Sequence, residues 1–215
     1  MQKYKAEFLE FVIKQQILQF GEFTLKSGRV SPYFFNAGLF NSGKKLAFLG
    51  KCYAAAIADS NLNFTTLFGP AYKGIPLVSA TALALATDYG LDKPYCFNRK
   101  EKKGHGEGGL IVGSQLLGDV LIIDDVITAG TAIREAVDII KGKDAILSGI
   151  IVAMDRQEKG TGDRSAIQEI EEMYNIPVIH IINLQNIIDY LDASNSSNLR
   201  THAETVNTYR RKYGI

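Results

Sequence analysis

The letters DVLIIDDVITAGTA occupy residues 119–132 and combine a strand pattern, two acids and a loop of small residues. Apolar residues follow one another without alternation within residues 119–123, which predicts a strand buried on both faces. Asp124 and Asp125 come directly after it. A loop of Thr, Ala and Gly follows, and a helix is predicted over residues 131–141. Such a loop at a helix N-terminus exposes backbone N–H groups, so it favours the binding of phosphate.

Short apolar strands alternate with helices on both sides of this segment. Strands are predicted over residues 66–69, 95–97, 119–123, 145–153 and 177–182, and helices over residues 44–59, 75–88, 131–141 and 165–174. The alternation predicts an α/β fold in which helices cover both faces of a central parallel sheet. Ligands bind beyond the carboxyl ends of the strands in such sheets, so the residues after each strand are candidates for a functional site.

The first 40 residues have a different pattern. An amphipathic helix is predicted over residues 5–19, a hairpin with a Ser-Gly turn over residues 23–29, and a strand over residues 33–37. Further helices are predicted after residue 182. The length of 215 residues suggests a single domain, and the sequence contains neither repeats nor long low-complexity linkers.

The composition excludes several classes of protein. The formal net charge is only +1, so the chain has no strongly basic arm for nucleic acid. No run approaches the ~18 apolar residues that a membrane span requires. Cys52 and Cys96 lack metal-binding spacing, and we interpret them as buried free thiols in a reducing compartment. We therefore expect a cytoplasmic protein that binds neither nucleic acid nor a membrane.

Two glycine motifs resemble nucleotide-binding signatures but fail on chemistry or context. Residues 38–45 almost match the P-loop, but Lys45 stands where a Ser or Thr hydroxyl must bind magnesium. A glycine-containing turn before a helix is the better interpretation. Residues 104–109 match GxGxxG, and Asp124 lies at a suitable distance for a ribose-binding acid. That motif must open a helix, whereas residues 110–118 are too few and include Gly113.

The two adjacent carboxylates beside the phosphate loop indicate more than an anion site. They fit a ligand that also carries hydroxyl groups, or a positive charge that develops during a reaction, and a ribose 5-phosphate has both features. Acidic residues near a helix N-terminus also stabilise the helix dipole. Capping alone does not explain paired acids that follow a buried strand directly.

The acidic segment resembles the signature with which type I phosphoribosyltransferases bind phosphoribosyl diphosphate (PRPP). Other segments are similar to the orotate phosphoribosyltransferases of that family: KSG at 26–28, SPYFF at 31–35, FGPAYKGIP at 68–76, NRKE at 98–101, HGEGG at 105–109 and DRQE at 155–158. The resemblance runs from the N-terminal helix to Tyr209 and Arg210. It is weakest between Asp192 and Leu199 and departs from the family pattern at Gly104.

The resemblance implies a fold, a reaction and a set of site residues. The implied fold is that of the type I phosphoribosyltransferases, a single domain over residues 1–215 with a small N-terminal hood built largely from about residues 1–40. The implied reaction joins PRPP and orotate to give orotidine 5′-monophosphate and pyrophosphate, in the biosynthesis of UMP. Its oxocarbenium-like transition state requires negative charge near the ribose and positive charge near the leaving group. The implied catalytic residues are Lys103, Asp124 and Asp125.

The implied binding residues fall into two groups. The PRPP group comprises Lys26, Tyr72, Lys73, Arg99, Lys100, Lys103, His105, Asp124, Asp125, Val126, Ile127, Thr128, Ala129, Gly130, Thr131 and Ala132. The orotate group comprises Phe34, Phe35, Thr128 and Arg156. Consecutive side chains of a strand point to opposite faces, so at most one of the two phenylalanine rings is expected to face the base.

The resemblance also implies a cofactor and an assembly. Mg²⁺ is expected to be carried mainly by PRPP, and no protein cage for a metal is visible in the sequence. The implied homodimer shares the basic, glycine-rich loop 99–109 between subunits as a lid. Two alternatives stay open: a phosphoribosyltransferase for another base, and a PRPP-sensing regulator without activity. The lid lysines and the lack of a DNA-binding module disfavour the regulator.

Overall fold

The computed structural model describes residues 1–25, 27–103, 109–128, 130–160 and 162–215. Within them a six-stranded sheet has the order β5-β4-β3-β6-β7-β8. Its strands are β3 (Thr66–Gly69), β4 (Tyr95–Lys103), β5 (Gly109–Gly113), β6 (Gly118–Asp124), β7 (Ala145–Asp155) and β8 (Val178–Asn183). All neighbouring pairs are parallel except β4 and β5, which are antiparallel. The predicted parallel sheet is thus confirmed, with one antiparallel strand at its edge.

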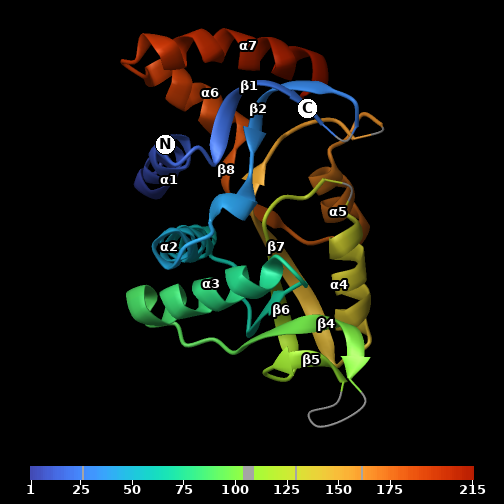
Figure 1. Ribbon diagram of the computed structural model, residues 1–215. Coiled ribbons are helices and arrows are strands. Elements are labelled where there is room, and N and C mark those ends of the chain that lie inside the picture. Colours follow the sequence, from blue (N-terminus) through green and yellow to red (C-terminus); the bar gives the residue numbers. More distant parts are fainter. Residues whose placement is uncertain (26, 104–108, 129, 161) are drawn as a thin grey trace.

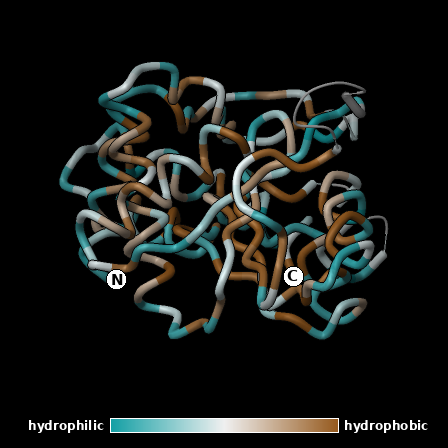
Figure 2. The backbone as a smooth tube through the Cα atoms, turned by 90° about the horizontal axis from the view of Figure 1, so that it is seen from below, coloured by the Kyte–Doolittle hydropathy of each residue, from teal (hydrophilic) through white to brown (hydrophobic). Residues whose placement is uncertain are grey.

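Helices cover both faces of this sheet (Figure 1). One face carries α2 (Gly43–Ser60) and α3 (Gly74–Tyr89), and the other carries α4 (Thr131–Lys141) and α5 (Ala166–Tyr174). Because helices cover both faces of the sheet, side chains on both sides of β6 are buried, and this explains its unbroken apolar run. Leu121 and Ile123 belong to the core on the side of α2 and α3, whereas Val120 and Ile122 belong to the core on the side of α4 and α5. Figure 2 shows the hydrophobic segments gathered inside the molecule.

The strand order reverses between β3 and β6. The chain proceeds from β3 to β4 and β5 at one edge, then returns to β6 beside β3 and continues to β7 and β8 at the other edge. The loops that follow β3 and β6 therefore leave the same edge of the sheet in opposite directions and open a crevice between them. This crevice is where the fold favours a ligand.

A second layer lies beside the sheet and draws on both ends of the chain. It contains α1 (Lys3–Lys14) and the antiparallel pair β1 (Leu18–Thr24) and β2 (Val30–Phe35). The C-terminal helices α6 (Leu184–Ala193) and α7 (Ser197–Tyr213) lie next to this pair (Figure 1). A short 3-10 helix, η1 (Ala37–Leu39), leads from β2 toward α2. The layer buries Phe8 and Tyr33 completely.

The first helix is shorter than predicted. The apolar pattern predicts a helix to residue 19, but α1 ends at Lys14 and β1 begins at Leu18. Gln16 adopts a positive φ of 55°, and the Ile17 N–H donates to the carbonyl of Val12. Leu18 is apolar because it is buried in β1. Its spacing from Val12 and Gln15 happens to fit a helix as well, which explains the longer prediction.

Three further expectations can be compared with the structure. Cys52 and Cys96 are free and buried, as predicted. The residues that almost match a P-loop run from η1 into the first turn of α2, where the Ser42 hydroxyl accepts a hydrogen bond from the Lys45 N–H at 3.4 Å. Among the described residues, no helix combines the length and the apolar character needed to cross a membrane.

Candidate active site

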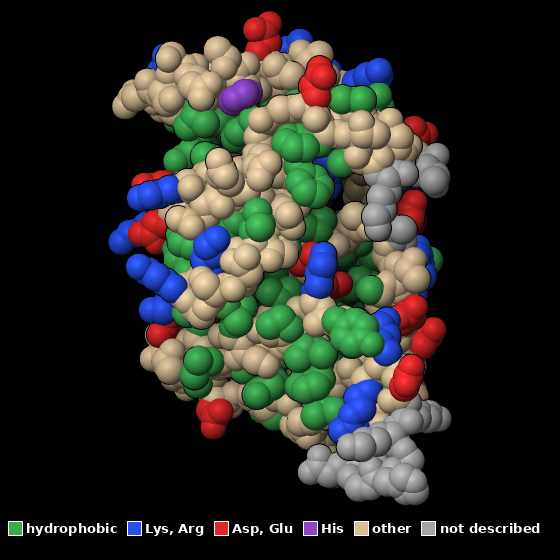
Figure 3. Space-filling view, in the orientation of Figure 1, with side chains coloured by type: hydrophobic (Ala, Val, Ile, Leu, Met, Phe, Trp, Pro, Cys, Tyr) green, Lys and Arg blue, Asp and Glu red, His purple; other side chains and the backbone are tan. Residues whose placement is uncertain are grey.

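The loop after β3 brings a lysine to the acidic pair. Gly69 ends β3 and Gly74 begins α3, and a side chain at Gly69 would overlap the carbonyl oxygen of Gly74. The two glycines therefore lie close together, and only four residues connect β3 to α3. Lys73 is one of them, and its Nζ is 2.5 Å from Oδ2 of Asp125. Tyr72 is 72% exposed at the same loop. Figure 3 shows basic and acidic side chains next to one another near the middle of the face of the molecule that it draws.

The acidic pair is buried at the end of β6. Asp124 and Asp125 are each only 8% exposed. The Asp125 N–H donates to Oδ1 of Asp124 at 2.9 Å, and the Tyr53 hydroxyl donates to the Asp124 carbonyl at 2.7 Å. Burial, and then the charge of Asp125, raise the pKa of Asp124 to about 7. The pair therefore holds a charge that is costly without a ligand, as functional carboxylates often do.

The loop after the acids leads into the N-terminus of α4. Gly130 precedes the helix with φ +71°, a conformation that favours glycine. Ile127 is buried and anchors the loop, whereas Thr128 and Thr131 are exposed. The first N–H groups of a helix lack intrahelical acceptors, so Thr131 and Ala132 present donors at the crevice. Val126, half-buried, completes the described part of the predicted phosphate loop.

The predicted base-binding residues lie on the other side of the acids. The Ala153 N–H of β7 donates to the Asp125 carbonyl at 2.8 Å, and Arg156 follows that strand directly. Arg156 also contacts β2, because its Nη2 lies 3.2 Å from the Ser31 hydroxyl. On β2, Phe34 is 37% exposed while Phe35 is buried against Phe8. Only one of the two phenylalanine rings is thus accessible, in line with the alternation of a strand.

The basic residues predicted to form a loop belong to a strand instead. The lid was expected to begin at residue 99, but β4 continues through Lys103 and pairs with β5 as a hairpin. That expected boundary is wrong, because the strand extends beyond Phe97, where its pairing with β3 ends. Arg99 donates to the Gly109 carbonyl at 3.4 Å, and Lys100 lies 3.2 Å from Glu135 of α4.

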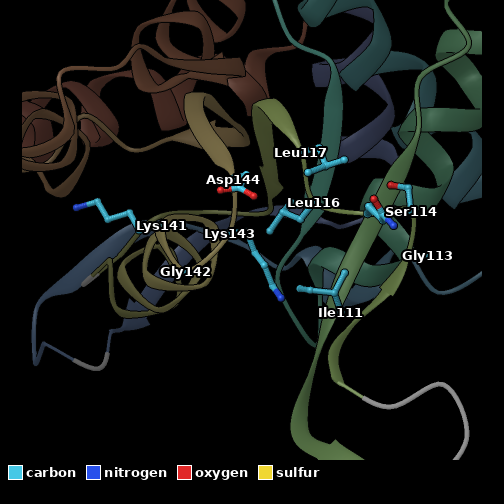
Figure 4. Close-up of a pocket in the computed structure, with 10 residues that line it drawn as sticks. Ile111, Gly113, Ser114, Leu116, Leu117, Lys141, Gly142, Lys143 and Asp144 are labelled. Atoms are coloured by element: carbon cyan, nitrogen blue, oxygen red, sulfur yellow. The ribbon is translucent and has the colours of Figure 1, made fainter.

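Some predicted site residues lie outside what the structure describes. These are Lys26, His105, Ala129 and the side chain of Lys103. A cavity of about 650 Å³ does lie within the described residues, but at the opposite end of the sheet. Ser114, Leu117 and Asp144 line it near the beginnings of β6 and β7 (Figure 4). It is therefore separate from the crevice that holds the acids.

Comparisons with known proteins agree with this geometry. The family model described as "Phosphoribosyl transferase domain" matches residues 40–180. Two orotate phosphoribosyltransferases, from Marinobacter nauticus and Vibrio parahaemolyticus, are 60% and 58% identical over the whole of both chains. The crystal structure of orotate phosphoribosyltransferase from Francisella tularensis has a TM-score of 0.88 at 46% identity, covering 97% of this chain and all of that one. The chain belongs to the orotate phosphoribosyltransferases.

Membership in the orotate phosphoribosyltransferases confirms the fold and the family that the sequence predicts. The fold is also shared by a PRPP complex of the Mycobacterium tuberculosis enzyme, with a TM-score of 0.62 at 20% identity. That likeness covers 85% of this chain and 98% of the other.

The structure of this orotate phosphoribosyltransferase shows residues that support the site and that the sequence did not predict. The Asn98 side chain is buried, and its Oδ1 accepts the Ala71 N–H at 2.8 Å, which fixes the loop that carries Lys73. Tyr53 supports the acidic pair from α2. Asn98 lies within the NRKE motif and Tyr53 in no motif, and neither contact can be read from the sequence because each joins residues far apart in the chain. Glu158 lies within the DRQE motif and pairs with Arg156 at 2.6 Å.

Proposed function

We propose that this orotate phosphoribosyltransferase binds PRPP at the carboxyl ends of β3 and β6, and orotate between β2 and Arg156. The protein transfers the ribose 5-phosphate group of PRPP to orotate, giving orotidine 5′-monophosphate and pyrophosphate. The observation that carries this placement is the contact of Lys73 with Asp125. In PRPP the pyrophosphate and the ribose hydroxyls are neighbours, and here a cation lies beside two carboxylates where the strand order reverses.

The reaction divides between the two sides of the crevice. The ring nitrogen of orotate loses its proton and forms a bond to the anomeric carbon as the bond from that carbon to the pyrophosphate oxygen breaks. The bonding electrons leave with pyrophosphate, and the proton is released to pyrophosphate or to water. Asp124 and Asp125 accept hydrogen bonds from the ribose hydroxyls and offset the positive charge on the ring. Lys73, Arg99 and Lys100 stabilise the leaving group.

The remaining binding contacts follow from the same placement. The loop from Val126 to Ala132 binds the 5-phosphate through the N-terminus of α4. Lys103 and His105 complete the contacts to pyrophosphate, and Tyr72 and Lys26 border PRPP. Arg156 recognises the orotate carboxylate with its planar guanidinium. The exposed Phe34 ring, the backbone of Phe35 and the Thr128 hydroxyl enclose the base.

We propose Mg²⁺ as the cofactor, carried on PRPP. Among the described residues, no three His, Cys, Asp or Glu side chains are grouped to hold a metal. The two carboxylates of Asp124 and Asp125 do fit the way proteins bind Mg²⁺, with one or two carboxylates and with substrate phosphates. The bound ion would neutralise charge on pyrophosphate. Activity is expected to disappear with a chelator and to return when Mg²⁺ is added.

We also propose a homodimer in which the arm formed by β4 and β5 reaches the partner's site. The support is the length of β4, which pairs with β3 only as far as Phe97 and then continues for six residues to Lys103. The basic residues of β4 thus extend beyond the point where its pairing with β3 ends. The buried free thiols support a reducing, cytoplasmic location.

A spectrophotometric assay of orotate consumption, with PRPP and Mg²⁺, tests the proposed function. Orotate should be consumed, whereas uracil, adenine and hypoxanthine should not. Consumption of another base in place of orotate would contradict the assignment, and binding of PRPP without any turnover would indicate a regulator.

The variant Arg156→Ala tests the placement of the base. Truncation of a buried arginine–anion contact costs roughly 2–5 kcal/mol. We therefore expect the KM for orotate to rise far more than the KM for PRPP. A larger rise in the KM for PRPP would place Arg156 on the other side of the site.

A further inference from the structure

A buried carboxylate, Glu158, joins three parts of the molecule next to Arg156. Its Oε1 accepts a hydrogen bond from the Tyr33 hydroxyl at 2.7 Å and another from Arg156 Nη2 at 2.6 Å. Its Oε2 accepts one from the Tyr209 hydroxyl at 3.1 Å. Tyr33 lies on β2, Tyr209 on α7 and Glu158 in the loop after β7. The Glu158 side chain is 10% exposed, so these donors replace water around it.

The backbone around Glu158 is also held from two directions. The Lys159 N–H donates to the Tyr213 carbonyl at 2.8 Å, and the Ile215 N–H donates to the Gln157 carbonyl at 3.1 Å. From the other direction, Arg29 donates to the Lys159 carbonyl at 2.7 Å. The carboxylate is therefore attached to a loop whose position is fixed by the segment between β1 and β2 and by the end of the chain.

These contacts orient the guanidinium of Arg156. Its Nη2 donates to Glu158 and to the Ser31 hydroxyl, and its Cζ lies 4.4 Å from the centroid of the Tyr33 ring. Both hydrogen bonds use Nη2, so the N–H groups of Nε and Nη1 take no part in the contacts with Glu158 and Ser31. A free arginine would lose rotamer freedom when it binds a substrate. An arginine that is already oriented avoids that loss.

The two tyrosine hydroxyls act as donors at neutral pH. Burial raises the pKa of Tyr33 well above its usual value. Burial, followed by the charge of Glu158, also raises the pKa of Tyr209. Both hydroxyls therefore stay protonated and donate to the carboxylate.

We propose that Glu158 is a positioning residue for orotate recognition, which acts through Arg156 and is supported by Tyr33 and Tyr209. The proposal rests on the placement of orotate at Arg156 in the proposed function. It assigns a role to α7, whose Tyr209 hydroxyl donates to Glu158 and whose Tyr209 ring contacts Tyr33 of β2. Loss of this support should weaken the binding of orotate and leave the binding of PRPP unchanged.

Two substitutions of Glu158 separate its geometry from its charge. Glu158→Ala removes the acceptor, and the KM for orotate is expected to rise at least about tenfold. In Glu158→Gln the amide oxygen accepts from Arg156 and Tyr33, while its NH₂ donates to the Tyr209 hydroxyl, which can also accept. The KM for orotate should then stay within about threefold of the wild type. Calorimetric titration with PRPP should give a Kd within about twofold of the wild type for both variants.

The variant Tyr209→Phe tests the support from α7 without altering Glu158. It removes one of the two hydroxyl donors, so the KM for orotate should rise about fivefold. Tyr174→Phe, which removes a hydroxyl at the end of α5 on the other face of the sheet, is the matched control. It should leave both KM values unchanged.

Three results would overturn the proposal: an unchanged KM for orotate in Glu158→Ala that still binds PRPP, an equal loss of affinity for both substrates, or a Gln variant as impaired as the Ala variant. If Glu158→Ala does not fold, Tyr209→Phe decides, and a KM for orotate equal to that of Tyr174→Phe overturns the proposal. Arg156→Ala identifies which idea has failed. If it impairs orotate binding while Glu158→Ala does not, only the positioning role is wrong.

Discussion

The burial of the Asp124 carboxylate has a cost in stability. Its pKa of about 7 in the folded protein lies above the ordinary value of 3.8. Between roughly pH 4 and pH 7 the folded protein binds more protons at this group than the unfolded chain does, so its contribution to stability is lost as the pH rises through that range. Each pKa unit corresponds to about 1.4 kcal/mol, so the penalty above neutral pH is on the order of a few kcal/mol.

Replacement of Asp124 by Asn removes this penalty and keeps an oxygen that accepts the Asp125 N–H. Near pH 8 the Tm of Asp124→Asn should exceed that of the wild type by several degrees, and the difference should shrink toward about pH 5. Thermal unfolding followed by circular dichroism at both pH values measures it. Asp138→Asn, on the exposed face of α4, is the matched control. A Tm difference for Asp124→Asn that does not depend on pH would contradict the argument.

The same substitution is expected to have the opposite effect on turnover. In Asp124→Asn and Asp125→Asn the shape of the side chain is kept but its charge is lost. Because the positive charge on the ribose ring is greatest in the transition state, kcat should fall much more than the affinity for PRPP. Steady-state kinetics combined with calorimetric binding of PRPP distinguishes the two quantities. Equal losses would assign both carboxylates to binding of the ground state.

At this scale the sequence predicts the proposed site residues but not those that support them. Asp124 ends β6, Asp125 follows it and Lys73 lies in the loop after β3, so the topology of the sheet makes their meeting predictable. The contact of Asn98 with Ala71 joins residues 27 positions apart. That of Tyr209 with Glu158 joins residues 51 positions apart. Such contacts depend on the packing of whole elements, and no local pattern encodes them.

Among the elements, the connection between β3 and α3 is the most tightly constrained. A side chain at Gly69 would overlap the backbone of Gly74 and also the Val78 side chain. Gly69→Ala should therefore destabilise the protein by about 1–3 kcal/mol and raise the KM for PRPP, because the loop that carries Lys73 must shift.

Chemical unfolding and steady-state kinetics measure these two effects. Gly43→Ala is the matched control, since a side chain there meets no atom within 4 Å. A Gly69→Ala variant as stable as Gly43→Ala, with an unchanged KM for PRPP, would show that the close approach does not position the loop.

Elements with a strong hydrophobic pattern are the ones that the sequence predicts best. β6 and α4 appear within one residue of their expected bounds, because an unbroken apolar run and a helical period are distinct signals. β5 was not predicted, since its five residues include glycine at both ends and pair antiparallel at the edge. The sequence places the end of α1 too late, because Leu18 continues the apolar spacing of the helix although it lies buried in β1.

At the scale of the whole molecule, mixed dimers test whether the arm formed by β4 and β5 reaches the partner's site. Lys103→Ala and Arg156→Ala should each be nearly inactive alone. If the arm reaches the partner's site, one site of a mixed dimer combines an intact Arg156 with an intact Lys103. Random mixing makes about half of the dimers mixed, so about a quarter of all sites should regain activity.

The experiment consists of unfolding and refolding the two variants together at equal concentration and measuring activity. Each variant refolded alone is the control, and mass measurement confirms the mixed dimers. If every site uses its own arm, each site of a mixed dimer keeps one defect. An absence of recovered activity in confirmed mixed dimers would rule out the shared site.

The half-exposed ring of Phe34 offers an optical reporter, because the protein contains no tryptophan. In Phe34→Trp the only indole of the molecule would stand on β2, where Phe34 stacks on Phe23 with a centroid distance of 5.6 Å. Orotate binding should change its fluorescence, so that occupancy of the base site could be followed without turnover. Met173→Trp, with an exposed indole on α5, should give emission that orotate leaves unchanged. An identical response of the two variants would place the ring of residue 34 away from the base.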